Sequence, residues 1–164
     1  NGFTLVELIV VVAIIGILAA ILVPSLMGYV SDSKLEAANN NARGIYTAVS
    51  RLSTKAQAVG NNVGTGRIWK QDSSGSGAYG SGINYNAMNI RDIDKEINSA
   101  SDWVYYVEMK DDLPVSVLAA KTKNDFYVGS YPAPADEKSS KSLSEAGSLG
   151  VLDKTQNANT ILGE

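Results

Sequence analysis

The chain has 164 residues, with 17 acidic and 14 basic side chains and a formal net charge of −3. This balance excludes a general nucleic-acid surface, so any DNA contact would depend on local patches. The chain contains no cysteine and no histidine. Disulfides and thiolate metal sites are therefore excluded. The usual general base and the commonest zinc ligand are also missing, which disfavours hydrolytic and metalloenzyme chemistry.

The first 30 residues form an apolar segment with one charged side chain. Apolar residues fill the run from Leu8 to Val23, and Glu7 carries the only side-chain charge before Asp32. A helix over residues 3–30 would be about 42 Å long, which is enough to cross a hydrocarbon layer of roughly 30 Å. We therefore expect a transmembrane helix. The absence of basic residues from this segment disfavours a removable secretory signal.

The carboxylate of Glu7 has two interpretations at this stage. An acidic residue costs about 2.5 to 3.5 kcal/mol at the centre of a membrane span, so it is normally functional and has a partner. Alternatively, Glu7 is close enough to the helix N-terminus to reach lipid headgroups and to favour the positive end of the helix dipole. The segment alone leaves both open.

Small residues lie on one stripe of this helix. At 100° per residue Ala13, Gly16, Ala20 and Pro24 share a face, and small residues at this spacing let another helix approach closely in an apolar medium. Pro24 removes a backbone hydrogen bond and Gly16 loosens the helix. The stretch between them is thus a candidate for kinking or local unwinding, although an ordinary membrane anchor also carries small residues.

Residues 31–59 predict an amphipathic helix. Apolar side chains recur there at steps of three and four residues, and Gly60 supplies a stop signal. These apolar positions are Leu35, Ala38, Ala42, Ile45, Val49, Leu52, Ala56 and Val59. The helix is therefore expected to lie against a core.

Residues 60–101 predict a connecting αβ loop. Glycine, serine and asparagine dominate it as far as Gly82, with Trp69 and Tyr79 as isolated anchors. Three isoleucines at helical spacing predict a short helix over residues 91–98.

Residues 102–132 predict an antiparallel sheet. The breaks between its apolar runs suit hairpin turns, so three strands form a meander, at residues 103–109, 115–121 and 126–131. The C-terminal segment, residues 133–164, either wraps the sheet or frays. The expected fold class is α+β, in which a long N-terminal helix packs on a small antiparallel sheet and residues 31–164 form the globular head.

The N-terminal sequence also resembles a known signal. Residues 2–9 read GFTLVELI and residues 13–21 read AIIGILAAI, followed by Pro24. This string closely resembles the class III signal and N-terminal helix of type IV pilins and pseudopilins, and the resemblance covers roughly residues 2–60. It implies a type IV pilin-like fold.

The resemblance further implies how the N-terminus is processed and used. Prepilin peptidase would cleave between Gly2 and Phe3, and the new N-terminus at Phe3 would be methylated, so that residues 1–2 are a remnant of the prepilin leader. Glu7 falls on the acidic position of the family, which pairs with the N-terminal amino group of a neighbouring subunit. A paired carboxylate in a helix bundle would set the axial register of the subunits.

In the same family, the positions matched by Gly16 and Pro24 bound a stretch that loses helicity during assembly. The implied function is that of a structural pilus subunit and not an enzyme, with no cofactor. Its implied partners are other copies of the chain in a helical homopolymer, the prepilin peptidase, the cytoplasmic membrane before assembly and the pilus assembly platform. Adhesion, surface motility, biofilm formation and DNA uptake are the implied uses of an extracellular filament.

A pseudopilin of a type II secretion or competence system is the first alternative, because it shares the N-terminal signature. Major pseudopilins often hold calcium in the C-terminal region. The carboxylates to inspect for such a site are Asp111, Asp112, Asp125, Asp136 and Asp153. Single carboxylates in turns are usually solvated, so no metal site is expected.

A membrane-tethered enzyme or binding module is the second alternative. The pairs Asp92/Asp94 and Asp111/Asp112 would have to carry its chemistry, but on a helix start and a hairpin they are expected to cap and solubilise. A weak contact with DNA or a host surface would use residues expected to be exposed or at loop roots: Lys70, Trp69, Tyr79 and Tyr85.

The chain departs from many pilins in having no C-terminal cysteine pair. Tyr131-Pro132 and the segment from Leu143 to Leu152 are the expected substitutes, packing on the sheet. Cysteine-free pilins are usual in Gram-positive bacteria, so the resemblance suggests such a source.

Overall fold

The computed structural model describes residues 2–70, 74–75, 77–97, 102–122, 125 and 127–135. Two compact units make up the chain: a first unit, Asn1–Ser33, and a second unit, Lys34–Glu164. Helix α1 (Leu5–Ala58) contributes to both units and contains Pro24.

The first unit is a helix without a core of its own. Every described side chain before Gly28 is exposed, including large apolar ones such as Ile21, which is 68% exposed. An 18-residue window of α1 reaches a mean hydropathy of 3.1, so by length and composition this helix can cross a membrane. The described residues leave these side chains uncovered, so an apolar environment around them would be favourable.

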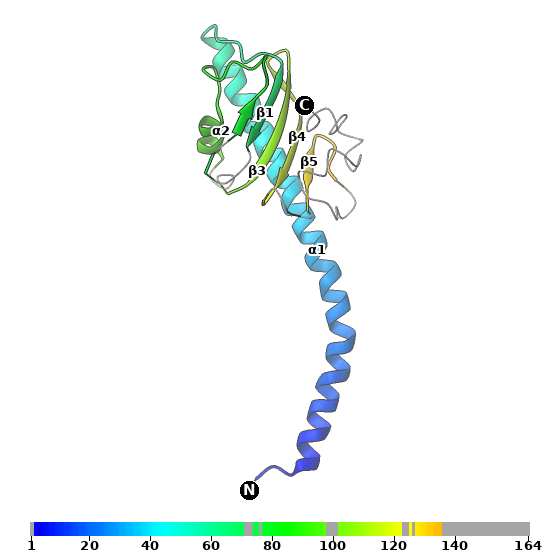
Figure 1. The fold of residues 1–164 in the computed structure, drawn as a ribbon. Helices are drawn as coiled ribbons and strands as arrows, with labels where there is room; N and C mark the ends of the chain where they lie inside the picture. Colours follow the sequence, from blue (N-terminus) through cyan, green and yellow to red (C-terminus); the bar gives the residue numbers. More distant parts are fainter. Residues whose placement is uncertain are drawn as a thin grey trace. The chain divides into compact units, whose positions relative to one another are not determined.

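The second unit combines the later part of α1 with a five-stranded sheet and the short helix α2 (Ile90–Glu96) (Figure 1). All neighbouring strands are antiparallel, and the order across the sheet is β2-β1-β3-β4-β5. The strands are β1 (Gly66–Lys70), β2 (Gly77–Tyr79), β3 (Val104–Lys110), β4 (Leu113–Ala120) and β5 (Gly129–Tyr131). The predicted α+β class is confirmed.

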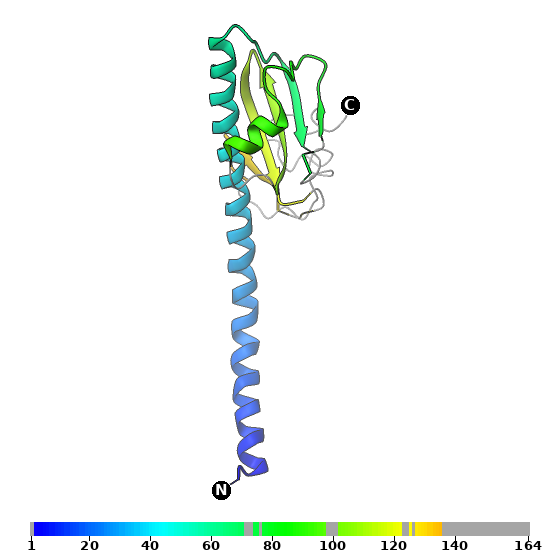
Figure 2. The ribbon, with the colours of Figure 1, turned by 90° about the vertical axis from the view of Figure 1, so that its left-hand side faces the viewer.

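Residues 34–58 of α1 lie along one face of the sheet (Figure 2). Their apolar face, with Ala42, Ile45 and Val49 fully buried, joins the inward side chains of the strands in the main core. Alternate residues of β3, such as Val104 and Tyr106, belong instead to a smaller cluster on the opposite face. The sheet is thus apolar on both faces, as expected where side chains alternate along a strand.

Two strands lie where the sequence predicted a loop. β1 and β2 fall within residues 60–82 and pair with each other, and β1 also pairs with β3. The prediction of a loop was wrong because short strands bounded by glycine and serine carry too few apolar residues to show a period of two. The predicted helix at 91–98 and the three later strands are present, with ends shifted by a few residues.

The structure also corrects the expectation that Lys70 is exposed. Its side chain is 0% exposed, and its Nζ lies 2.8 Å from Oδ2 of Asp94, whose side chain is 18% exposed. The hydroxyl of Tyr105 donates to Oδ1 of Asp94 at 3.2 Å. Burial, reinforced by the charge of Asp94, raises the pKa of Tyr105 far above its ordinary value. The ion pair therefore connects β1 with α2 beside the core.

Helix α2 begins with a capping box. The side chain of Asn89 accepts from the main-chain N–H of Asp92 at 3.2 Å, and the carboxylate of Asp92 accepts from the N–H of Asn89 at 3.3 Å. The expected capping role of Asp92 is therefore confirmed. Asp94 is different, because its carboxylate faces Lys70 and is not a cap.

Asn39 of α1 holds the last described residues in place. Its Oδ1 accepts from the N–H groups of Ser130 and Ala135 at 3.0 and 3.1 Å, and its Nδ2 donates to the carbonyl of Ala135 at 2.9 Å. Tyr131 packs edge-on against Tyr46 with ring centroids 4.9 Å apart. Of the expected substitutes for a disulfide, Tyr131 is thus in contact with α1, whereas the segment from Leu143 to Leu152 lies outside the described residues.

Candidate functional site

The predicted cleavage point precedes helix α1. Gly2 and Phe3 are exposed, Phe3 by 89%, and neither belongs to a helix or strand. The first helical turn closes at Thr4, whose carbonyl accepts from the N–H of Leu8 at 3.2 Å. The Gly2–Phe3 peptide bond is therefore in irregular backbone, where a peptidase can reach it without unwinding a helix.

Thr4 and Glu7 form a capping box at the start of α1. The main-chain N–H and the hydroxyl of Thr4 donate to Oε2 of Glu7 at 2.8 and 2.7 Å, and the Thr4 hydroxyl oxygen accepts from the N–H of Glu7 at 3.3 Å. This reciprocal pattern satisfies free donors of the first turn. The sequence reasoning missed Thr4, although the spacing Thr-x-x-Glu before an apolar run is the signature of this motif.

The geometry brings together the two interpretations of Glu7. The carboxylate caps the helix, as the local interpretation required, but both hydrogen bonds from Thr4 go to the same oxygen, Oε2. None of the described residues donates to Oε1. Because a carboxylate has acceptor sites on both oxygens, Glu7 can cap its own helix and accept from a cationic partner together.

The stripe of small residues is helical and exposed. α1 continues unbroken through Ala13, Gly16, Ala20 and Pro24, and a Cβ built on Gly16 would meet no atom within 4 Å. Pro24 has no N–H to donate to the carbonyl of Ala20, one turn earlier. The stripe is thus open to a second helix, and the unwinding of residues 16–24 stays a prediction.

Two of the carboxylates considered for calcium, those of Asp112 and Asp125, bind main-chain N–H groups. Asp111 and Asp112 form the β3–β4 turn with φ of +50° and +68°, which is the pattern of a type I′ hairpin. Oδ1 of Asp112 accepts from the N–H of Gly64 at 2.6 Å, and Oδ1 of Asp125 accepts from the N–H of Tyr127 at 3.3 Å. The described part of the chain contains no group of three or more metal-ligating side chains. Asp136 and Asp153 lie outside it.

The residues suggested for contact with DNA or a host surface do not form one surface. Lys70 is buried, and the hydroxyl of Tyr79 accepts from the N–H of Ile90 at 2.9 Å, which places Tyr79 against α2. Tyr85 is exposed near Tyr79, with ring centroids 6.1 Å apart. Trp69 lies on the other face of the sheet, where it stacks on Tyr106.

The chain thus combines an exposed apolar helix, which is long enough to cross a membrane and has a capped acidic residue in its first turn, with a helix-and-sheet unit. Comparison with known proteins agrees. Residues 1–23 match the family described as the prokaryotic N-terminal methylation motif. No solved structure is significantly similar to this chain.

Three relatives are similar over about 50 residues. The chain is 53% identical to the type IV major pilin protein PilA of Myxococcus xanthus (strain DK1622) over 48 residues, which are 29% of this chain and 22% of the relative. It is 54% identical to the fimbrial protein EcpC of Eikenella corrodens over 50 residues, 30% of this chain and 33% of the relative. It is 47% identical to a fimbrial protein of Moraxella nonliquefaciens over 50 residues, which are 30% of this chain and 32% of the relative.

Each match therefore spans no more than about a third of the relative's length. Within this limit, the predicted resemblance is confirmed. The chain carries the N-terminal methylation motif, and its similar proteins are named type IV pilin and fimbrial protein.

Proposed function

We propose that this chain is a pilin, the structural subunit of a type IV pilus. One observation carries the proposal: the methylation motif covers the start of α1, where all the described apolar side chains before Gly28 are exposed, and an acidic residue with one open oxygen lies in the first turn. The chain acts by assembling with copies of itself and not by catalysis.

The apolar first unit is suited to two environments, the membrane before assembly and the filament after it. Before assembly, the lipid of the cytoplasmic membrane covers its side chains, since the helix is long enough to span the hydrocarbon layer. In the extracellular filament, the same side chains are covered by the helices of other subunits. The helix exchanges one apolar surrounding for another, so the transfer carries little hydrophobic penalty.

The position of Glu7 supports a role in subunit register. After cleavage of the Gly2–Phe3 bond, the methylated amino group of Phe3 is a cation at the end of the helix. A neighbouring subunit presents Oε1 of Glu7 to it, while Oε2 stays on Thr4. A carboxylate buried in a helix bundle without such a cation would be strongly unfavourable, so misplaced subunits are rejected.

Exchange of Glu7 tests this proposal. We expect Glu7→Gln to insert in the membrane and to be cleaved before Phe3, yet to give no surface filaments, because the amide lacks the charge that pairs with the amino group. Electron microscopy with an antibody to the second unit measures filaments, and mass spectrometry of the N-terminus measures cleavage and methylation.

Two control variants separate pairing from other effects. Glu36→Gln removes an exposed carboxylate later on α1 and should leave filaments unchanged. Thr4→Val removes the hydroxyl partner of Glu7 but keeps the carboxylate, so filaments should still form. Normal filaments from Glu7→Gln would contradict the register role, and short or absent filaments from the unaltered chain would favour a pseudopilin.

A further inference from the structure

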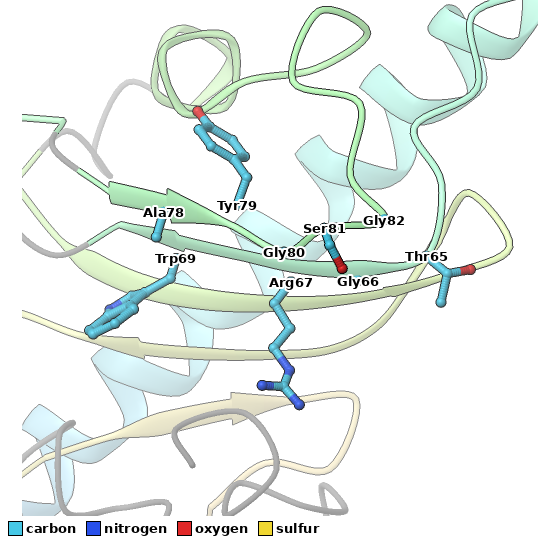
Figure 3. A pocket seen from close by; sticks show the side chains of 9 residues that line it. All are labelled: Thr65, Gly66, Arg67, Trp69, Ala78, Tyr79, Gly80, Ser81 and Gly82. Atoms are coloured by element: carbon cyan, nitrogen blue, oxygen red, sulfur yellow. The ribbon is translucent and has the colours of Figure 1, made fainter. Parts of the chain in front are cut away.

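A hollow lies over strands β1 and β2, on the face of the sheet opposite α1. Its volume is about 330 Å³. We name it the β1–β2 hollow, and its lining residues are Thr65, Gly66, Arg67, Trp69, Ala78, Tyr79, Gly80, Ser81 and Gly82. Figure 3 shows the side chains of Arg67, Trp69 and Ser81 on one side of the two strands and that of Tyr79 on the other. The hollow belongs wholly to the second unit.

The hollow exists because β1 carries large side chains where β2 carries small ones. Trp69 pairs with Ala78, and the same register places Arg67 opposite Gly80, whose N–H donates to the carbonyl of Arg67 at 2.8 Å. Side chains opposite one another on a sheet share a face. The indole and the guanidinium therefore stand beside a methyl group and a bare backbone, which leaves space over β2.

Trp69 is held as a flat wall of the hollow. On the side of β3, its ring stacks on Tyr106 with centroids 4.8 Å apart and an angle of 20° between the planes. Its neighbour on the side of β2 is Ala78, whose single methyl group is too small to cover an indole. One face of the ring is thus supported from behind, and the other looks over the hollow.

Arg67 brings a positive charge to the same wall. Its guanidinium has no ion-pair partner among the residues that the structure describes. Its cross-strand neighbour on β3 is Glu108, whose carboxylate accepts from the hydroxyl of Ser116 at 3.4 Å. The Arg67 guanidinium is half-buried and has no ion-pair partner among the described residues, so two of its N–H groups can donate in parallel to the carboxylate of a ligand.

We propose that the β1–β2 hollow binds a sugar that carries one carboxylate, such as a uronic or sialic acid. The apolar face of the sugar ring packs on Trp69, and its carboxylate accepts from Arg67. Residues two apart on a strand are about 7 Å apart, which suits a ring on one side chain and an exocyclic acid group on the other. The Ser81 hydroxyl, which points to the same side, can bond a sugar hydroxyl (Figure 3).

The charge pattern favours this ligand over a nucleic acid. Binding to a phosphate backbone draws its affinity from several cations in a row. Among the described residues that line the hollow, Arg67 is the only cation, and Glu108 is its neighbour on β3. A ligand with a single negative group satisfies the guanidinium without bringing further phosphates toward the carboxylate.

Saturation-transfer NMR on the full chain in detergent micelles tests the inference. The probes are glucuronic acid, galacturonic acid and N-acetylneuraminic acid, with glucose as the neutral sugar and a short oligothymidylate as the nucleic acid. We expect transfer to ring protons of at least one acidic sugar, with a dissociation constant on the order of 1 mM, typical of a small ligand in a shallow site.

Variants identify the site. Arg67→Gln should lower the affinity for acidic sugars about tenfold and leave the affinity for neutral sugars unchanged, because only the charge-assisted hydrogen bond is lost. Trp69→Leu should abolish saturation transfer to acidic and neutral sugars alike. Arg91→Gln, which removes an exposed arginine on α2, should change nothing. Circular dichroism confirms that each variant is folded.

The proposal is overturned if none of the three acids receives saturation from the unaltered chain. Equal losses with Arg91→Gln, or binding of the oligothymidylate in place of the sugars, would overturn it as well. The result is independent of filament assembly, because the hollow lies in the second unit and the experiment uses unassembled protein. Failure here and failure of the pilin proposal are therefore distinguishable.

Discussion

At the scale of single residues, Asn39 has the clearest structural role. Its side-chain amide makes three hydrogen bonds: Oδ1 accepts from the N–H groups of Ser130 and Ala135, and Nδ2 donates to the carbonyl of Ala135. Beside it, a Cβ on Gly129 would overlap the backbone of Ala38 and Asn39, so β5 can approach α1 this closely only with glycine there. A non-covalent clamp thus fastens the last described residues in a chain without cysteine.

Replacing Asn39 by Ala should lower the free energy of unfolding by about 2 kcal/mol, because Ser130 and Ala135 lose their partners. Urea unfolding of the full chain in detergent micelles, followed by tryptophan fluorescence, measures the change. Asn40→Ala is the matched control: this exposed neighbour gains the same helix propensity but loses no clamp. Equal stabilities of the two variants would contradict the role of the clamp.

At the scale of elements, the pair Lys70–Asp94 connects strand β1 to helix α2. The ammonium is wholly buried, and the carboxylate also accepts from Tyr105. A second ion pair, Arg51–Glu96, joins α1 to α2 at 2.8 Å, but the Arg51 side chain is 70% exposed. Solvent screens the exposed pair, whereas it hardly screens the attraction between the buried ammonium and the Asp94 carboxylate.

We therefore expect unequal effects from removing the two acids of α2. Asp94→Ala should destabilise the second unit by about 3 kcal/mol, since it removes a negative charge 2.8 Å from a buried ammonium and the acceptor of the Tyr105 hydroxyl. Glu96→Ala should cost less than about 1 kcal/mol. Thermal unfolding by circular dichroism compares them, and a smaller loss with Asp94→Ala than with Glu96→Ala would refute the assignment.

Elements with a strong period were predictable, and those without one were not. The three- and four-residue spacing of Leu35, Ala42 and Val49 on α1 was sufficient to predict which face is buried. β1 and β2 were missed because strands this short are defined by pairing with β3 and not by their own pattern. For the same reason Lys70 was taken as exposed: its counter-charge lies 24 residues away in α2, a contact that no local pattern reveals.

The candidate site was predictable in a different way. Glu7 was identified as the only charged side chain of the apolar segment, whereas its partner, and the residues Gly2 and Phe3, were predicted through a family resemblance, since single residues near a chain start have no periodicity to read. The open Oε1 of Glu7 could not be predicted, because a sequence does not state which carboxylate oxygen a donor uses.

At the scale of the whole molecule, the two units rely on different surroundings. All apolar side chains that are buried among the described residues belong to the second unit, beginning with Leu35. The first unit keeps its apolar surface exposed. The stability of the fold thus resides in one unit, and the need for lipid or a partner resides in the other.

A chain that begins at Gly28 should consequently fold without detergent. We expect it to be monomeric by size-exclusion chromatography and to melt cooperatively, within about 5 °C of the full chain in micelles, because no buried core residue is removed. Aggregation or a non-cooperative transition would show that residues before Gly28 contribute to the fold of the second unit.

Strand β1 presents alternate side chains to the two faces of the sheet, and the two sets have different roles. Ile68 and Lys70 point into the packed interior, where a change disturbs the fold, while Arg67 and Trp69 point to the β1–β2 hollow. Selection acting on ligand preference can therefore alter position 67, and can exchange Trp69 for another aromatic side chain that still stacks on Tyr106, while the interior positions are kept. Natural variants of the chain are therefore expected to differ more at positions 67 and 69 than at positions 68 and 70.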